Sequence, residues 1–172
     1  FILFYRKLNF ISNPSRFMVK EIDNRQSSLH IISKDDLKNK LINHSLWLSS
    51  EQKEGERANL AGYSLRGIVL IGENLKKANL KGAYLYGAYL KNSNLEEANL
   101  SGANLRGANL RWVNLQGANL SGSNLMRADL LEANLKNSNL IGANLQMSDG
   151  LTKKQINQAQ TNESTSLPDL LG

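Results

Sequence analysis

Leucine recurs at every fifth position from Leu60 to Leu145 without a single exception. Two residues before each leucine, most units have Ala or Ser, and the residue between them is Asn or Asp in most units. The unit therefore reads Ala-Asn-Leu-x-x and occurs eighteen times in tandem. Such short tandem repeats indicate a solenoid, in which each unit buries its apolar side by stacking on further copies of itself.

A period of five residues excludes both an ordinary helix and a flat strand. In an α-helix, leucines five residues apart step about 140° around the axis and form no common stripe. In a flat strand, the odd spacing sends successive leucines to opposite faces. A three-residue side followed by a two-residue corner places the small residue and Leu inward and Asn outward in every unit. Square corners require about four units, or about twenty residues, per coil, so we predict an all-β solenoid.

Glycine marks the expected corners. The second x residue is Gly in ten of the eighteen units, and one complete column at a period of twenty is glycine, namely Gly62, Gly82, Gly102, Gly122 and Gly142. Glycine readily adopts the positive φ that a tight corner requires. The leucines should stack inside the coil at about 4.8 Å, each contributing on the order of 1.5–3 kcal/mol.

The Ala-Asn/Asp-Leu-x-x units over residues 58–149 resemble the pentapeptide repeat family, in the style of its cyanobacterial members. The resemblance implies a right-handed quadrilateral β-helix, and eighteen units would make about 4.5 coils of it. The segment from His44 to Leu60 resembles the helical lead-in of many bacterial members, and the segment from Gly150 to Pro168 resembles a common C-terminal cap.

The chain should divide into four segments. We expect a disordered or extended leader at 1–32, an N-terminal capping helix and linker at 33–57, the repeat β-helix at 58–150, and a C-terminal capping helix and tail at 151–172. Ser33 and Thr152 are the expected N-caps, because their side-chain oxygens can accept hydrogen bonds from the first helical turn. The two helices would then cover the open strand edges of the end coils.

Four units depart from the small residue at the first inward position, namely Tyr63, Ile68, Glu73 and Val113. The first three lie in the first coil, where we expect Tyr63 and Ile68 to pack on Leu41 and Leu48 of the N-terminal helix. An unpaired buried carboxylate is costly, so Glu73 should turn outward or form hydrogen bonds near the rim. Val113 implies a slight local widening of the coil.

No constellation for catalysis is recognisable, so we expect no enzyme, no cofactor and no metal site. The sequence contains no cysteine, and its two histidines, His30 and His44, both precede the repeat. It has no phosphate-binding loop, nucleophile elbow or His-x-x-x-His pair. His44 should pack between the N-terminal helix and the first coil rather than act as a ligand or base.

The outward side chains carry the remaining information. The face centred on Leu75 and Leu95 shows Lys76, Glu96, Gln116 and Lys136, a solvated charge ladder. The two faces centred on Leu85/Leu105 and Leu90/Leu110 share an edge, and they place outside the candidate partner-binding residues Tyr84, Tyr86, Tyr89, Lys91, Arg106, Arg111, Trp112 and Arg127. Exposed Tyr, Trp and Arg commonly anchor interfaces. The alternative is a chance cluster on a solvated surface.

These features predict a non-catalytic protein-binding or structural scaffold module. Some pentapeptide repeat proteins bind DNA gyrase as acidic mimics of DNA, which is the first alternative. Residues 58–150 carry nine basic and six acidic side chains, so their positive charge disfavours it. The second alternative, direct binding of nucleic acid, is disfavoured because a net charge this small attracts phosphates only weakly.

The expected partner is another protein, rather than nucleic acid or a membrane. A homodimer through an exposed end coil is a further alternative, because an uncovered strand edge can pair with a second copy. The leader lacks a convincing signal peptide, since its short apolar stretch is followed at once by Arg6 and Lys7. We therefore expect a cytoplasmic location.

Overall fold

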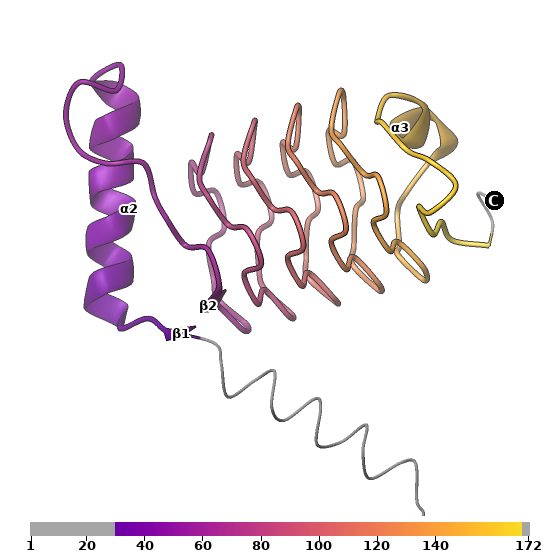
Figure 1. Ribbon diagram of the computed structural model, residues 1–172, viewed down its shortest axis with the longest axis horizontal. Coiled ribbons are helices and arrows are strands. Elements are labelled where there is room, and N and C mark those ends of the chain that lie inside the picture. Colours follow the sequence, from indigo (N-terminus) through magenta and orange to yellow (C-terminus); the bar gives the residue numbers. More distant parts are fainter. Residues whose placement is uncertain (1–29, 170–172) are drawn as a thin grey trace, which may run out of the picture.

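The computed structural model describes residues 30–169 of the chain. It contains two helices and two short strands, namely β1 (His30–Ile31), α2 (Lys34–Ser49), β2 (Tyr63–Ser64) and α3 (Lys153–Asn157). Figure 1 shows a row of stacked coils with α2 at one end and α3 at the other. Most of the predicted leader (1–32) lies outside the described residues. Near its end, His30–Ile31 form β1.

The coils repeat every twenty residues. Parallel bridges join each outward residue to the one twenty positions later, as in Asn59 to Asn79 and Asn79 to Asn99. Within such a pair, the Leu60 amide donates to the Asn79 carbonyl at 2.7 Å, and the Asn79 amide donates to the Ala58 carbonyl at 2.9 Å. The solenoid prediction is confirmed. Each side of a coil is so short that only one residue bridges to the next coil, which is why named strands are few.

Four faces run along the stack, and we number them by their central leucines. They are face 1 (Leu80, Leu100), face 2 (Leu85, Leu105), face 3 (Leu90, Leu110) and face 4 (Leu95, Leu115). Every repeat leucine is 0–2% exposed, and the alanines two positions before them are buried as well. The serines at three of these inward positions are also buried, and Ser93 and Ser138 donate to the carbonyls of Leu90 and Leu135. The interior therefore has the predicted composition.

The corners have the predicted backbone. In all eighteen units the second x residue has positive φ, whether it is glycine, as at Gly102 (64°), or not, as at Lys77 (62°). The turn is closed by a hydrogen bond to the leucine carbonyl, for example from the Ala78 amide to Leu75 at 2.9 Å. Non-glycine residues rarely adopt this conformation, so the units without glycine carry a strained corner.

The outward Asn has a structural role that sequence reasoning did not find. In all fourteen units with Asn or Asp, its Oδ1 accepts from the backbone amide two residues later, as Asn99 does from Ser101 at 3.1 Å. Asn and Asp favour this Asx turn, which fixes the start of the corner. Four units lack it, with Ser64, Val69, Tyr84 and Tyr89 in its place.

The N-terminal end joins α2 to the first coil. Ser33 caps the helix by accepting from the Asp36 amide at 3.0 Å. The side chains of Leu37, Leu41, Tyr63 and Ile68 pack at the end of the leucine core. Strand β1 pairs in parallel with β2 and so lengthens face 2 by one strand. Glu73 is exposed, as expected for its charge.

The C-terminal end continues the ladder past the last repeat. Thr152 begins α3 with a capping box, and the Gln155 Nε2 donates to the carbonyls of Leu130 at 3.1 Å and Ala133 at 2.9 Å. After α3, Gln160 bridges to Asn139 and Ser166 bridges to Asn144. The tail thus adds two further sides to the stack, although its sequence has no five-residue unit.

His44 links α2 to the first coil, as the sequence suggested. Its ring is fully buried and stacks on Trp47 at 5.7 Å, and its Nδ1 accepts from the Ala58 amide at 3.1 Å. Burial lowers the pKa of His44, the Lys76 backbone opposes this shift, and the charge of Arg57 adds to it. Among residues 30–169, no group lies in hydrogen-bonding geometry to the Nε2 atom.

Stability should fall when the pH drops below about 6.5, the ordinary pKa of histidine. The unfolded chain binds the proton first because the pKa of His44 is lowered in the fold, so the free energy of unfolding decreases by at most about 1.4 kcal/mol per pH unit. Urea unfolding between pH 5 and 8 measures this. His44→Asn keeps an acceptor without a titrating ring and should flatten the profile, whereas an unchanged slope in the variant would contradict the assignment.

Candidate interaction surface

The eight candidate partner-binding residues lie along faces 2 and 3 and the corners beside them. Tyr89, Trp112 and Arg127 are exposed, and the remaining five are half-buried, namely Tyr84, Tyr86, Lys91, Arg106 and Arg111. The coil geometry brings them into two separate clusters rather than one. We call these the Tyr86 cluster, with Arg66, Tyr84 and Arg106, and the Trp112 cluster, with Lys91 and Arg111.

The Tyr86 cluster is a stack of aromatic and guanidinium groups on face 2. Tyr84 stacks on Tyr86 with ring centroids 6.1 Å apart and planes at 11°. The guanidinium carbons of Arg66 and Arg106 lie 5.3 Å and 6.0 Å from the Tyr86 ring centroid. Each such cation–π contact contributes about 0.5–1 kcal/mol at an exposed site. Sequence reasoning missed Arg66, although a period of twenty places Arg66, Tyr86 and Arg106 in one column.

The Trp112 cluster lies between face 3 and the following corner. Lys91 Nζ is 4.7 Å and the Arg111 guanidinium carbon 4.9 Å from the Trp112 ring centroid. Arg111 also pairs with Asp129 at 3.0 Å, a partly exposed ion pair that adds little stability. Trp112 itself occupies a corner position with φ of 56° and leaves 44% of its surface exposed. A large aromatic residue at a strained, exposed corner suggests a use outside the fold.

The other two candidates stand apart from these clusters. Tyr89 bridges to Asn109 in the ladder of face 3, and Arg127 occupies a corner with φ of 58°. Within residues 30–169, neither takes part in an aromatic stack, a cation–π contact or an ion pair. The period of twenty gave the correct columns, but it could not tell which side chains reach one another.

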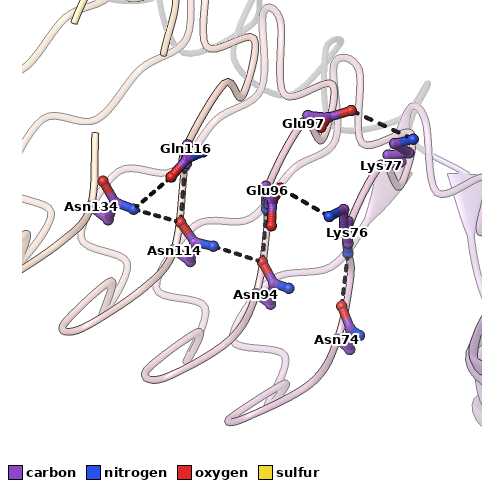
Figure 2. A network of polar contacts seen from close by, with 9 residues as sticks. All are labelled: Asn74, Lys76, Lys77, Asn94, Glu96, Glu97, Asn114, Gln116 and Asn134. Carbon is purple, nitrogen blue, oxygen red and sulfur yellow. Dashed lines mark hydrogen bonds and ion pairs between the residues drawn. The ribbon is translucent and has the colours of Figure 1, made fainter. Parts of the chain in front are cut away.

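The charge of faces 2 and 3 is one-sided near α2. Residues 63–72, 83–92 and 103–112 contain four basic side chains and no acidic one. Face 4 and its corner differ, because Lys76 pairs with Glu96 at 2.9 Å and Lys77 with Glu97 at 3.6 Å (Figure 2). The hydrogen bond that the Lys76 ammonium donates to Glu96 raises the pKa of Lys76. Face 4 therefore neutralises its own charges, whereas on faces 2 and 3 near α2 only Arg111 has an acidic partner among the described residues, namely Asp129 of the next coil.

Figure 2 also shows an amide ladder below these ion pairs. The Asn114 Nδ2 donates to Asn94 Oδ1 at 3.2 Å, and the Asn134 Nδ2 donates to Asn114 Oδ1 at 3.0 Å. Side chains that bond along the stack in this way hold one another in place. The structure thus has on face 4 the solvated ladder that its sequence indicated.

The described residues also bear on metal sites and membrane-spanning helices. Residues 30–169 bring together no group of three or more His, Cys, Asp or Glu side chains that could hold a metal ion. Within the same range, neither α2 nor α3 combines the length and the apolar character that a membrane-spanning helix needs.

The chain matches the profile of the family described as Pentapeptide repeats, in eight copies over residues 56–92, 83–122 and 108–146. These matches together span residues 56–146, which is more than half of the chain. None of the curated proteins compared with the chain matches it.

Several solved structures are similar to it. A pentapeptide repeat protein from the Arabidopsis thaliana thylakoid lumen is 31% identical, with 52% of this chain and 70% of that chain covered and a TM-score of 0.33. The protein Rfr23 from the cyanobacterium Cyanothece is 29% identical, with 74% and 99% covered and a TM-score of 0.34. QnrB1, a plasmid-mediated fluoroquinolone resistance protein, is 20% identical, with 67% and 60% covered and a TM-score of 0.46.

Proposed function

Because the chain belongs to the pentapeptide repeat family, we propose that it is a non-catalytic protein-binding or structural scaffold module that presents side chains on a rigid β-solenoid. The observation that carries the proposal is the pair of clusters on faces 2 and 3, around Tyr86 and Trp112. Tyr, Trp and Arg are the residue types that most often dominate interface energetics. Their regular spacing follows from a core whose only role is to hold the outer columns in place.

The finer architecture is part of the same proposal. The eighteen units would form a right-handed quadrilateral β-helix of about 4.5 coils, with α2 and α3 as its caps. The bridges at a spacing of twenty residues support four sides per coil. The position of the two helices at opposite ends of the stack supports their capping role (Figure 1). The division of the chain at residues 33, 58 and 151 rests on the same grounds.

A protein partner suits this surface better than nucleic acid does. Acidic mimicry of DNA requires a negative surface, and the net charge of residues 58–150 is positive. Nucleic acid binding would need a stronger positive field than nine basic against six acidic side chains provide. The Trp112 ring already has Lys91 and Arg111 beside it, which leaves less of its face for stacking on a base.

The triple variant Arg106→Ala, Arg111→Ala, Trp112→Ala should lose the partner while it keeps the fold. All three side chains point outward and each of their cation–π contacts contributes only about 0.5–1 kcal/mol, so the variant should fold and melt moderately earlier, whereas loss of interface anchors typically weakens binding at least tenfold per anchor. Quantitative pull-down from the lysate of the source organism compares it with the wild type.

The matched control is Lys76→Ala, Glu96→Ala, Lys136→Ala on face 4, which should retain the same protein. Capture that is equal in all three samples, or absent from all, would leave faces 2 and 3 as an ordinary solvated surface. Capture that disappears at moderate salt together with bound nucleic acid would instead indicate the nucleic acid alternative.

The proposal includes a cytoplasmic location, and it is compatible with a monomer or with a homodimer through an end coil. The location rests on the sequence grounds given above, although the Arabidopsis neighbour comes from the thylakoid lumen. The homodimer alternative needs a free strand edge at one end coil. Light scattering over a range of protein concentrations would detect it.

A further inference from the structure

A groove of about 380 Å³ runs between α2 and the first coil, next to face 3. We call it the α2 groove. Its apolar walls are Leu37, Leu41 and Ile42 on the helix and Val69 on the coil. Ile42 leaves 56% and Val69 leaves 64% of its surface exposed, so both sides of this open groove present apolar surface to solvent. The groove therefore has room and apolar contact area for an added side chain.

Further exposed apolar side chains lie on face 3 beyond the groove. Val69 bridges to Tyr89 in the next coil, and Ile71 precedes a corner on the same side. Ile71 and Tyr89 are about half exposed, and Trp112 follows one coil further on. We call Ile71, Tyr89 and Trp112 the face 3 strip. Large apolar side chains that stay exposed on one face of a protein often mark an interaction site.

The missing Asx turns coincide with this region. Only four of the eighteen units lack the outward Asn or Asp, and all four lie on faces 2 and 3 in the two coils nearest α2. Elsewhere the Asn Oδ1 satisfies an amide of the corner, and such a hydrogen bond stabilises by about 0.5–1.5 kcal/mol. At Val69 and Tyr89 the chain has exposed apolar surface in place of that bond. Departures from a local rule concentrate at functional sites.

The charges around this region select the partner. Lys34 and Lys38 line the α2 groove together with one acidic side chain, Glu73. Lys91 and Arg111 flank the face 3 strip, and the first three coils of faces 2 and 3 contain no acid, although Arg111 pairs with Asp129 of the fourth coil. A second copy of the chain would bring the same positive surface against this one, and that is unfavourable. An acidic partner complements it.

We propose that the α2 groove and the face 3 strip bind an acidic protein segment, which inserts an apolar side chain between α2 and Val69. The segment's carboxylates then lie against Lys34, Lys38 and Lys91. The inference rests on the proposed function, because it supplies the partner class of the same surface. An open apolar groove with room for a side chain suits a peptide anchor, whereas nucleic acid has no aliphatic anchor.

Selection from a display library of random twelve-residue peptides tests the partner class. The full chain is the bait, and single-stranded oligonucleotide and vesicles containing phosphatidylserine serve as competitors. We expect enriched peptides to combine an aliphatic or aromatic residue with flanking Asp or Glu, and to resist both competitors. Failure to enrich such peptides would overturn the inference, and so would displacement of the peptides by oligonucleotide or vesicles.

Two variants locate the binding site. Val69→Asn should restore the Asx turn to the Ile71 amide and so raise the melting temperature by about 2–4 °C. The same variant should bind the enriched peptides at least tenfold more weakly. Ile42→Glu should weaken peptide binding to a similar extent, because it places a negative charge in the groove against the acidic peptide. The matched control is Asn119→Val on face 1, which loses its bond to the Ser121 amide and should melt earlier but bind normally.

The outcomes separate this inference from the proposed function. Suppose that the peptides still bind to Val69→Asn and Ile42→Glu but no longer bind to the Arg106, Arg111 and Trp112 triple variant. The groove would then be excluded as the binding site, and the scaffold proposal would stand. Peptides that still bind to all of these variants would contradict both this inference and the proposed function.

Discussion

Replacement of Leu105 with Arg should abolish folding. Leu105 lies in a middle coil with none of its surface exposed, and its amide bonds to the Asn124 carbonyl at 2.7 Å. The change removes about 1.5–3 kcal/mol of leucine burial. It also forces a cation into a column of leucines with no acceptor or counter-charge, which costs several kcal/mol more. Together the two losses are comparable with the ordinary margin of 5–15 kcal/mol of a single domain, and the central coil has no room for the longer side chain.

Circular dichroism and soluble yield measure this result. The matched control is Leu105→Met, which keeps the volume and the apolar character and should cost less than about 1.5 kcal/mol. A soluble Leu105→Arg variant that melts normally would refute the inward position of the repeat leucines.

Gly150→Ala should destabilise the C-terminal end far more than Gly102→Ala destabilises a middle corner. Both glycines have positive φ, 69° and 64°, so alanine adds the same backbone strain of about 1 kcal/mol at each. They differ in their surroundings. A Cβ at Gly102 would have no neighbour within 4 Å, whereas one at Gly150 would lie 2.6 Å from the backbone nitrogen and Cα of Leu131. The Gly150 variant must therefore push the chain away from Leu131, at an additional cost of about 1–3 kcal/mol.

Hydrogen exchange and urea unfolding distinguish the two variants. In Gly150→Ala we expect faster exchange in α3 and in the sides at Gln160 and Ser166, because these follow the displaced residue. In Gly102→Ala we expect a small uniform loss of stability. Equal losses in the two variants would contradict the close approach of Gly150 to Leu131.

The repeat was predictable because its period alone excludes other backbones. A leucine at every fifth residue leaves only a short side and a corner, and the glycines then mark which corner residue needs positive φ. The continuation after α3 was not predictable, because Gln160 and Ser166 bridge into the stack from a stretch without the unit. There the register is set by the docking of α3 through Gln155 and not by a local pattern.

The candidate surface was predictable only as columns. The spacing of twenty placed Tyr86 with Arg106 and Lys91 with Arg111, but side-chain torsions decide which rings and cations meet. The outward Asn was assigned its direction from the alternation of the strand, whereas its Asx bond depends on the dihedral angles of the corner. The α2 groove depends on the angle at which the helix packs on the first coil, and no local pattern encodes that angle.

Photo-crosslinking in the source cell tests the central claim most directly. Benzoylphenylalanine is placed in turn at Tyr89 and Trp112 on the proposed interface, and at Ser121 on face 1 and Gln116 on face 4. We predict adducts of one defined mass from positions 89 and 112 and none of that mass from the other two. Equal adducts from all four positions, or adducts from positions 116 and 121 alone, would contradict a partner-binding role for face 3.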